Sequence, residues 1–212
     1  MVKFVKNRVE EIMEKDIFKD KTVLELGCVG TGDDDQIGGE NWLHGRISKV
    51  SRKIIGLDID KKGVKKLKKE GYGVRYKDVE KRFDLKEKFD IIIAARVLEH
   101  IQNLKVFMEN IHRHLKKSGL FIIITPNAHS ISFFIQLLIK GRVDISKKHT
   151  HWHDINTIKN LLKSNGFEVI LVEYSHSRPI FKRLRGYLVQ MFWIFFPKRM
   201  GRQIFLIAKL KK

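Results

Sequence analysis

Short apolar runs separated by helix-length segments are the feature that most limits how this chain can fold. The runs are rich in Ile, Val, Leu and Phe. Such continuous apolar runs are typical of strands that are buried on both faces of a parallel sheet. Their alternation with helices predicts βαβ units and a doubly wound sheet. The predicted strands are 22–27, 53–60, 74–78, 89–95, 120–126, 167–174 and 203–210.

Helices are predicted between these strands from the spacing of apolar residues and from terminal signals. Asp154 and Gly166, for example, bracket one segment as an N-cap and a C-terminal glycine. No repeat or low-complexity linker interrupts the pattern, and 212 residues suit one hydrophobic core. We therefore expect one α/β domain over residues 1–212, with helices on both faces of the sheet and a leading helix in 1–19. The other predicted helices are 61–71, 103–117, 128–141 and 154–165.

The charge of the chain is strongly positive, with 43 Lys and Arg residues against 24 Asp and Glu residues and a net charge of +19. Such a field attracts nucleic acid, an anionic membrane or an anionic small substrate. Lysine enrichment is also a general habit of some thermophilic proteomes, so net charge alone does not select a partner. The single cysteine, Cys28, excludes a disulfide framework and agrees with a reducing cytoplasm.

The N-terminal residues 1–15 are charged throughout and lack the apolar core of a signal peptide. No apolar run approaches the roughly 18 residues that are needed to span a bilayer. We expect a cytoplasmic location, with a peripheral position on the inner face of the membrane as an alternative. The oligomeric state has no signal in the sequence.

A glycine-rich loop follows the first predicted strand and carries Gly27, Gly30 and Gly32. Glycines at the carboxyl end of a first strand let the backbone approach a nucleotide-like ligand closely. Their spacing differs from the G-x-G-x-x-G of dinucleotide-binding proteins, and an acid, Glu25, stands two residues before the first of them. A carboxylate at this place suits a cationic ligand end better than a pyrophosphate.

Two further acids end the next strands. Asp58 closes the second strand, where a carboxylate accepts ribose hydroxyls, and Asp78 follows the third, within reach of an adenine edge. Together the three acids would serve an amine, a ribose and a nucleobase. A ligand with these three parts is an adenosyl amino acid.

The order E-x-G-x-x-G, D-x-D, K-D-V-E and V-L-E-H-I resembles class I S-adenosylmethionine-dependent methyltransferases. Within them it resembles the ubiquinone/methionine-biosynthesis-like group of small-molecule methyltransferases, as do the later T-P-N and G-F-E-V segments, over roughly residues 20–175. The resemblance implies a Rossmann-like sheet of seven strands whose last strand is antiparallel and lies beside the fifth. It also implies S-adenosyl-L-methionine (SAM) as the cofactor. The residues implied to bind it are Glu25, Gly27, Cys28, Gly30, Asp58, Ile59, Asp78, Val79 and Ala95.

One position departs from the family pattern. Val29 occupies the place of the second glycine of E/D-x-G-x-G-x-G, and the loop over 33–45 is longer than usual. Either the loop follows an altered path or affinity for the cofactor is weakened. A cofactor-binding or scaffold protein without activity is therefore one alternative to an enzyme.

His100, after the fourth strand, is the candidate catalytic residue. Methyl transfer is an in-line displacement in which the protein mainly aligns the nucleophile, and a hydroxyl acceptor also needs a base for its proton. The alternative is that Glu99 and His100 only cap and orient the turn.

Histidines are dense at 149–153, which reads HTHWH. In an extended segment alternate side chains share a face, so His149, His151 and His153 could converge on a metal or an anionic substrate. A polar lid whose Asp154 caps the next helix is the favoured interpretation. We expect His149 and His151 to bind substrate, and no metal.

Two classes of nucleic-acid methyltransferase are disfavoured by absent motifs. Cys28 lies in the cofactor loop, which leaves no cysteine to attack a pyrimidine, and 94–97 reads AARV rather than N/D-P-P-Y. An RNA methyltransferase remains an alternative because of the charge, but nucleic acid is the less favoured partner.

Residues 178–202 form a basic, aromatic segment with helical spacing of its apolar residues. It could be a lid over the acceptor pocket, an interfacial anchor on an anionic membrane through 180–197, or a dimer contact. The sequence therefore predicts a SAM-dependent methyltransferase that transfers a methyl group to an oxygen of a small-molecule or lipid-linked acceptor.

Overall fold

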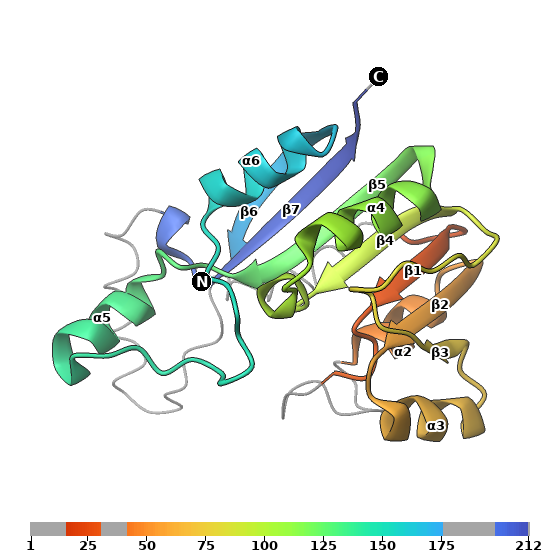
Figure 1. The fold of residues 1–212 in the computed structure, drawn as a ribbon, viewed down its shortest axis with the longest axis horizontal. Helices are drawn as coiled ribbons and strands as arrows, with labels where there is room; N and C mark the ends of the chain where they lie inside the picture. Colours follow the sequence, from red (N-terminus) through yellow and green to blue (C-terminus); the bar gives the residue numbers. More distant parts are fainter. Residues whose placement is uncertain (1–15, 31–41, 176–197, 212) are drawn as a thin grey trace, which may run out of the picture.

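One sheet of seven strands organises the chain (Figure 1). The structure, a computed structural model, describes residues 16–30, 42–175 and 198–211. The predicted strand segments all form strands, with shifts at their ends. The strands are β1 Thr22–Leu26, β2 Lys53–Asp58, β3 Val74–Tyr76, β4 Phe89–Ala95, β5 Leu115–Pro126, β6 Phe167–Ser175 and β7 Gln203–Leu210.

The order of the strands is β3-β2-β1-β4-β5-β7-β6. Neighbouring strands from β3 to β5 run parallel, whereas β7 runs antiparallel between β5 and β6. The predicted antiparallel last strand beside the fifth is confirmed. The chain leaves β1 toward β3 and then returns to the other side of β1 with β4. This reversal creates a switch point at the carboxyl ends of β1 and β4, which is where open parallel sheets bind ligands.

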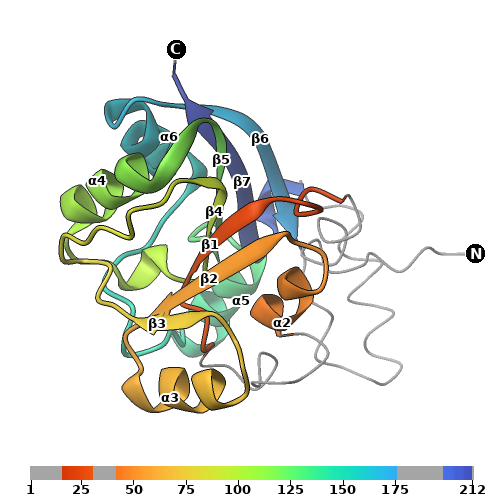
Figure 2. The same cartoon turned by 90° about the vertical axis from the view of Figure 1, so that its right-hand side faces the viewer.

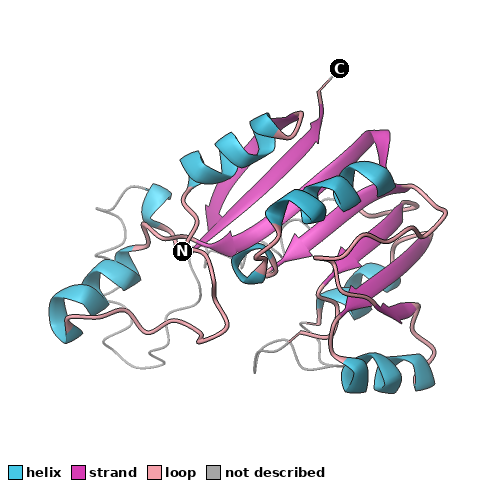
Figure 3. Ribbon diagram, viewed as in Figure 1, coloured by secondary structure: helices cyan, strands magenta, loops and turns pink. Residues whose placement is uncertain are grey.

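Helices cover both faces of the sheet, as predicted (Figures 2 and 3). The helices α4 and α6 lie together on one face, while α2 lies on the other. The described α-helices are α2 Leu43–Ser48, α3 Lys61–Lys69, α4 Leu104–His114, α5 Ile131–Lys140 and α6 Ile155–Ser164, and the short turns η1 Leu98–His100 and η2 Lys198–Met200 complete the set. None of these helices has both the length and the apolar character of a membrane-spanning segment.

The two faces bury separate apolar clusters because successive strand residues point to opposite sides. Ile92 of β4 packs in the cluster that holds Phe107 of α4 and Ile158 of α6. Its neighbour Ile91 packs in the other cluster, with Ile47 of α2. Strands buried on both faces explain why the sequence shows continuous apolar runs rather than alternation.

Two helices differ from the sequence prediction, and a third predicted helix lies mostly outside the described residues. The helix predicted over 103–117 ends at His114, because Leu115 takes an extended conformation and pairs with Phe89 as the first residue of β5. Both side chains are fully buried, so this pairing outweighs the helical spacing of the segment. The helix α2 was not predicted, since 33–45 reads as a loop. Most of the predicted leading helix (1–19) lies outside the described residues, and 16–20 form turns.

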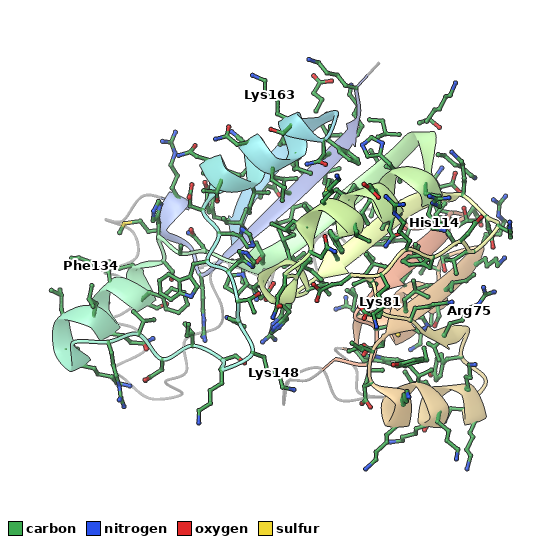
Figure 4. All side chains as sticks on the ribbon, in the orientation of Figure 1. Arg75, Lys81, His114, Phe134, Lys148 and Lys163 are labelled. Atoms are coloured by element: carbon green, nitrogen blue, oxygen red, sulfur yellow. The ribbon has the colours of Figure 1, made fainter. Side chains whose placement is uncertain are left out.

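His114 joins the end of α4 to the loop before β4 (Figure 4). The side chain is buried, its Nδ1 donates to the carbonyl of Asn110 (2.8 Å), and its Nε2 accepts from the backbone N–H of Leu85 (3.0 Å). These two bonds require the neutral ring, because a protonated Nε2 cannot accept. Burial lowers the pKa of His114, against the opposing effects of the Asn110 carbonyl and the Asp84 carboxylate.

This arrangement predicts a loss of stability on acidification. The unfolded chain begins to take up a proton at its histidine near pH 6.5, while folded His114 resists protonation to lower pH. The contribution of neutral His114 to the free energy of unfolding is therefore complete above pH 6.5. It declines as the pH falls toward the lowered pKa of the folded state, with a slope of at most about 1.4 kcal/mol per pH unit.

Urea unfolding of the wild type and of His114→Gln over this range measures the effect. Gln can make both hydrogen bonds and does not titrate, so the variant should show a shallower loss of unfolding free energy on acidification. Equal pH slopes for the two proteins would contradict the assignment.

Candidate functional site

The carboxyl ends of β1, β2 and β3 bring the predicted cofactor residues to one edge of the sheet. Leu26 pairs with Leu57, and Asp58 pairs with Tyr76. Asp58 therefore lies beside the chain at Gly27, and Asp78 lies two residues beyond the end of the neighbouring strand. The structure thus assembles the glycine loop and two of the predicted acids on adjacent strand ends.

Gly27 makes the turn at the end of β1. Its φ is 75°, in the region that favours glycine, and a Cβ atom there would lie 2.6 Å from Cγ2 of Val97. Its N–H donates to the carbonyl of Leu57 at 2.8 Å, which holds the loop against β2. Gly30 also has a positive φ, 68°. The loop therefore needs glycine at both positions for its backbone conformation, and at Gly27 also because a side chain would collide with Val97.

Asp58 holds this loop in place. One carboxylate oxygen accepts the N–H of Val29 at 2.9 Å and the other accepts the N–H of Asp60 at 2.8 Å. The side chain is half-buried, and each carboxylate oxygen has a further lone pair. Asp58 can therefore accept hydroxyl groups of a ribose while it keeps both backbone contacts.

Beyond Asp58, the residues at positions 59, 78 and 79 offer an apolar and a polar surface for a nucleobase. Ile59 is a large apolar side chain left 65% exposed at this edge. Asp78 is half-buried; it accepts the N–H of Glu80 at 3.0 Å and lies 3.4 Å from Nζ of Lys81. Val79 is partly buried against the core, and its carbonyl accepts the side-chain amide of Asn110 at 3.0 Å. These residues fit an adenine ring with its polar edge toward Asp78.

Glu25 is placed beneath the loop. It is 3% exposed, and its Oε2 lies 2.7 Å from Nδ1 of the fully buried His44. Burial, followed by the carboxylates of Glu25 and Asp58, raises the pKa of the Cys28 thiol. Both acids therefore lie near Cys28, whose thiol stays protonated and unreactive. The role of Glu25 at an amine end of the ligand stays a prediction.

Two further residues were not found from the sequence. Trp42 donates from Nε1 to the carbonyl of Cys28 at 2.9 Å, and its ring packs on His44 and Tyr72. Arg96, at the end of β4, has a φ of 57°, which is uncommon for a residue with a side chain. The triplet W-L-H at 42–44, after the glycine loop, is a sequence signal that could have pointed to Trp42. No sequence signal pointed to Arg96. Ala95, the remaining predicted cofactor residue, is half-buried before Arg96.

Val29 does not obstruct the loop. It has no positive φ, so its backbone does not require glycine. Its side chain is buried in a cluster with Val64 and Leu67 of α3. The space for it exists because Gly63 of α3 has no Cβ: a Cβ there would lie 2.4 Å from Cγ1 of Val29. The departure from the family pattern is thus accommodated inside the protein, away from the ligand side of the loop.

His100 lies beyond β4, in η1, with a defined tautomer. Its Nδ1 lies 3.0 Å from the carbonyl of Lys148, and because a carbonyl only accepts, Nδ1 must carry the proton. The neutral ring therefore presents Nε2 as a base. The ring of His149 lies 4.9 Å from that of His100, and burial lowers the pKa of His149, because protonation would place a charge in a desolvated position close to His100 and to the cation of Arg96.

Glu99 connects this turn with the histidine-rich segment. Its backbone carbonyl accepts the N–H groups of Thr150 at 2.9 Å and His151 at 3.2 Å. Its side chain is buried; one oxygen accepts the hydroxyl of Thr125 at 3.1 Å, and Oε1 has no hydrogen-bond partner among the described residues. Burial raises the pKa of Glu99.

The histidines of 149–153 do not face one centre. His149 turns toward His100, whereas His151 and His153 stack on each other with ring centroids 5.8 Å apart. A different set could hold a cation, since one donor atom from each of Glu99, His100 and His149 lies within 4.8 Å of the others. Oxygen and imidazole donors suit Zn²⁺ and related ions.

A small cavity lies between this turn, the start of α5 and the histidine-rich segment. Its walls combine aromatic, aliphatic and polar side chains, and the rings of Phe133 and Trp152 stack 5.3 Å apart. The cavity thus collects both predicted substrate-binding histidines near the candidate base. Its lining residues are Glu99, Pro126, Ala128, Phe133, Ile145, His149, His151, Trp152 and His153.

Comparison with known proteins agrees with this geometry. The family profile described as a methyltransferase domain matches residues 2–172. A probable S-adenosylmethionine-dependent methyltransferase of Mycolicibacterium smegmatis is 29% identical over 157 residues, which cover 70% of this chain and 52% of that protein. A ubiquinone biosynthesis O-methyltransferase of Bradyrhizobium diazoefficiens is 27% identical over 121 residues, which cover 55% of this chain and 44% of that protein. The chain spans about half the length of these relatives.

Solved structures share the fold. A SAM-dependent methyltransferase from Archaeoglobus fulgidus superposes with a TM-score of 0.65 and 18% identity, over 95% of this chain and 94% of that one. At this identity the likeness concerns the fold, including the strand order that creates the switch point.

The contact between Val29 and Gly63 predicts a coupled effect on stability. Gly63→Ala should lower the free energy of unfolding by about 1–3 kcal/mol, although alanine favours helices, because the new methyl group overlaps Val29 and Asp60. In a Val29→Gly background the same substitution should cost at least about 1 kcal/mol less.

Urea unfolding of the two single variants, the double variant and the wild type measures this coupling. Lys65→Ala, at an exposed position of the same helix, is the control for helix propensity. Additive effects of the two substitutions would show that Val29 and Gly63 do not depend on each other.

Proposed function

The chain belongs to the methyltransferase domain family, and from this premise we propose that it transfers a methyl group from SAM to an oxygen of a small-molecule or lipid-linked acceptor. The observation that carries the proposal is the edge formed by the Gly27 turn, the Asp58 carboxylate and Asp78 on adjacent strands. Its residue types match the ribose, the base and the close backbone approach of an adenosyl ligand.

The chain's own residues would hold the cofactor by distinct contacts. Asp58 would accept from the ribose hydroxyls, and Asp78 and Ile59 would serve the polar edge and the ring of the adenine. The backbone from Gly27 to Gly30 would hold the amino-acid part, with the buried pair of Glu25 and His44 nearby. When bound, SAM supplies a methyl group on a sulfonium sulfur, which departs with the electron pair of the broken carbon–sulfur bond.

His100 would act as the base for a hydroxyl acceptor. Because Nδ1 donates to the carbonyl of Lys148, Nε2 is the ring nitrogen that can take up a proton. As the acceptor oxygen forms its bond to the methyl carbon, the hydroxyl proton passes to Nε2. His149 and Arg96 are the neighbours of this base. The lowered pKa of His149 favours its neutral form.

The lining of the small cavity beside His100 has the chemistry of an acceptor site, although its volume of about 10 Å³ holds no more than a water molecule. Phe133, Trp152 and Ile145 offer apolar walls, while Glu99 and the histidines offer polar groups near the base. The names of the relatives include ubiquinone biosynthesis O-methyltransferases, which supports oxygen as the acceptor atom. The acceptor itself is part of the proposal.

Cofactor binding is tested by calorimetry with SAM. Asp58→Asn should weaken SAM binding about 10- to 100-fold, because hydrogen bonds to a charged acceptor contribute about 1.5–3 kcal/mol. Asp84→Asn, at an exposed acid of another loop, should leave the affinity unchanged. A folded Asp58→Asn protein that binds SAM as tightly as the wild type would refute the assignment of the ribose site.

Activity is tested with labelled SAM and fractionated cell extract. Label should enter the lipid or small-metabolite fraction, and His100→Ala should lower the rate by about 10²–10⁴-fold at unchanged SAM affinity. His112→Ala on α4 is the control histidine.

The distribution of label separates the alternatives. Label in RNA with a steep salt dependence would replace the proposed acceptor by RNA. Binding of SAM without transfer to any fraction would favour the scaffold interpretation, and full activity of His100→Ala would reject His100 as the base.

A further inference from the structure

The helix α5 exposes an unusual amount of apolar surface. Seven of its ten residues are apolar. Helices of this composition are normally buried in a protein core or in a membrane. Here five large side chains, between 40% and 77% exposed, point into solvent: Phe134, Ile135, Leu137, Leu138 and Ile139. An exposed patch of this kind marks an interaction site.

The polar stripe of α5 contacts the segment that follows the helix, whereas the apolar residues Ile131 and Phe133 of its first turn pack on the rest of the described chain. Ser132, Gln136 and Lys140 are spaced by four residues and therefore share one stripe. Oε1 of Gln136 accepts the N–H of Asp144 at 2.9 Å, and Nζ of Lys140 lies 2.5 Å from the Asp144 carboxylate. The segment after α5 folds back along the polar stripe, and the apolar residues from Phe134 to Ile139 are left outside.

Positive charge follows the apolar residues of α5 along the chain. The segment 131–148 contains Lys140, Arg142, Lys147 and Lys148 against one acid, Asp144, so that its formal net charge is +3. Lys140 and Arg142 both contact Asp144, while Lys147 and Lys148 are exposed. Figure 4 marks Phe134 on α5 and Lys148 on the segment that follows it.

We propose that α5 docks on an anionic lipid surface, with its apolar residues among the acyl chains and the lysines of 140–148 at the head groups. Exposed apolar side chains next to a cluster of cations are the two requirements for interfacial binding. A ten-residue helix is about 15 Å long, half the apolar thickness of a bilayer, so α5 would lie in the interface rather than cross it.

Docking by α5 would bring the cavity next to the lipid. Phe133 of α5 lines the cavity and stacks on Trp152, and Ile145 of the basic segment lines it as well. Docking would therefore place lipid-borne groups near residues that line this cavity. The docking itself does not depend on the proposed methyl transfer and is measured without cofactor or substrate.

The test is cosedimentation of the full chain with vesicles of phosphatidylcholine, with and without phosphatidylglycerol. The wild type should bind the anionic vesicles and lose affinity at raised salt. Leu138→Glu with Ile139→Glu should weaken binding by about tenfold or more, and Lys147→Glu with Lys148→Glu should do so on anionic vesicles.

Matched changes elsewhere separate this surface from general hydrophobicity and charge. Ile170→Glu replaces an exposed apolar residue of β6, and Lys65→Glu with Lys66→Glu removes the same charge from α3. These controls should retain most of the binding. If they lose as much as the α5 variants, or if the α5 variants bind like the wild type, the proposal is wrong.

Sedimentation velocity without lipid tests the competing occupant. A wild-type dimer that Leu138→Glu with Ile139→Glu converts to a monomer, together with no vesicle binding by the wild type, would assign the patch to a second copy of this chain instead.

Discussion

The carboxylate of Asp58 is the contact on which the cofactor half of the site depends. It receives the N–H of Val29 from the loop after β1 and the N–H of Asp60 before α3, so one side chain joins two adjacent strand ends. Asp60 in turn caps α3 by accepting the N–H of Lys62. These contacts fix the path of the loop, the start of α3 and the position of the Asp58 carboxylate at the same time. The edge is therefore preorganised for a ligand.

The loop also depends on packing below it. Val29 stands where the family pattern has glycine, and Gly63 on α3 leaves the volume that its side chain occupies. Glu25 and His44 form a buried pair, and the ring of His44 packs on Trp42, whose indole donates to the carbonyl of Cys28. Close-packed interiors leave little room for independent change, so a substitution in the loop is accompanied by a fitting residue elsewhere.

The acceptor half is assembled by the carbonyl of Glu99. It accepts two N–H groups from a segment about 50 residues later in the chain, which brings His149 to the ring of His100 and closes a small cavity against α5. The base, the cavity and the exposed apolar helix are then consecutive parts of one surface. This continuity connects the chemistry of the turn with the membrane that we propose α5 to contact.

The sequence by itself determined the parallel sheet, because apolar strands buried on both faces leave a local pattern, and it located the glycine loop and the acids Asp58 and Asp78, because each follows a strand directly. It did not determine where α4 ends, since the pairing of Leu115 with Phe89 is not a local property. Only the tertiary structure decided that Val29 packs against Gly63, that His44 holds Glu25, that His149 rather than His151 faces His100, and that α5 exposes its apolar residues from Phe134 to Ile139. Each of these follows from contacts between residues distant in the chain, which no local spacing records.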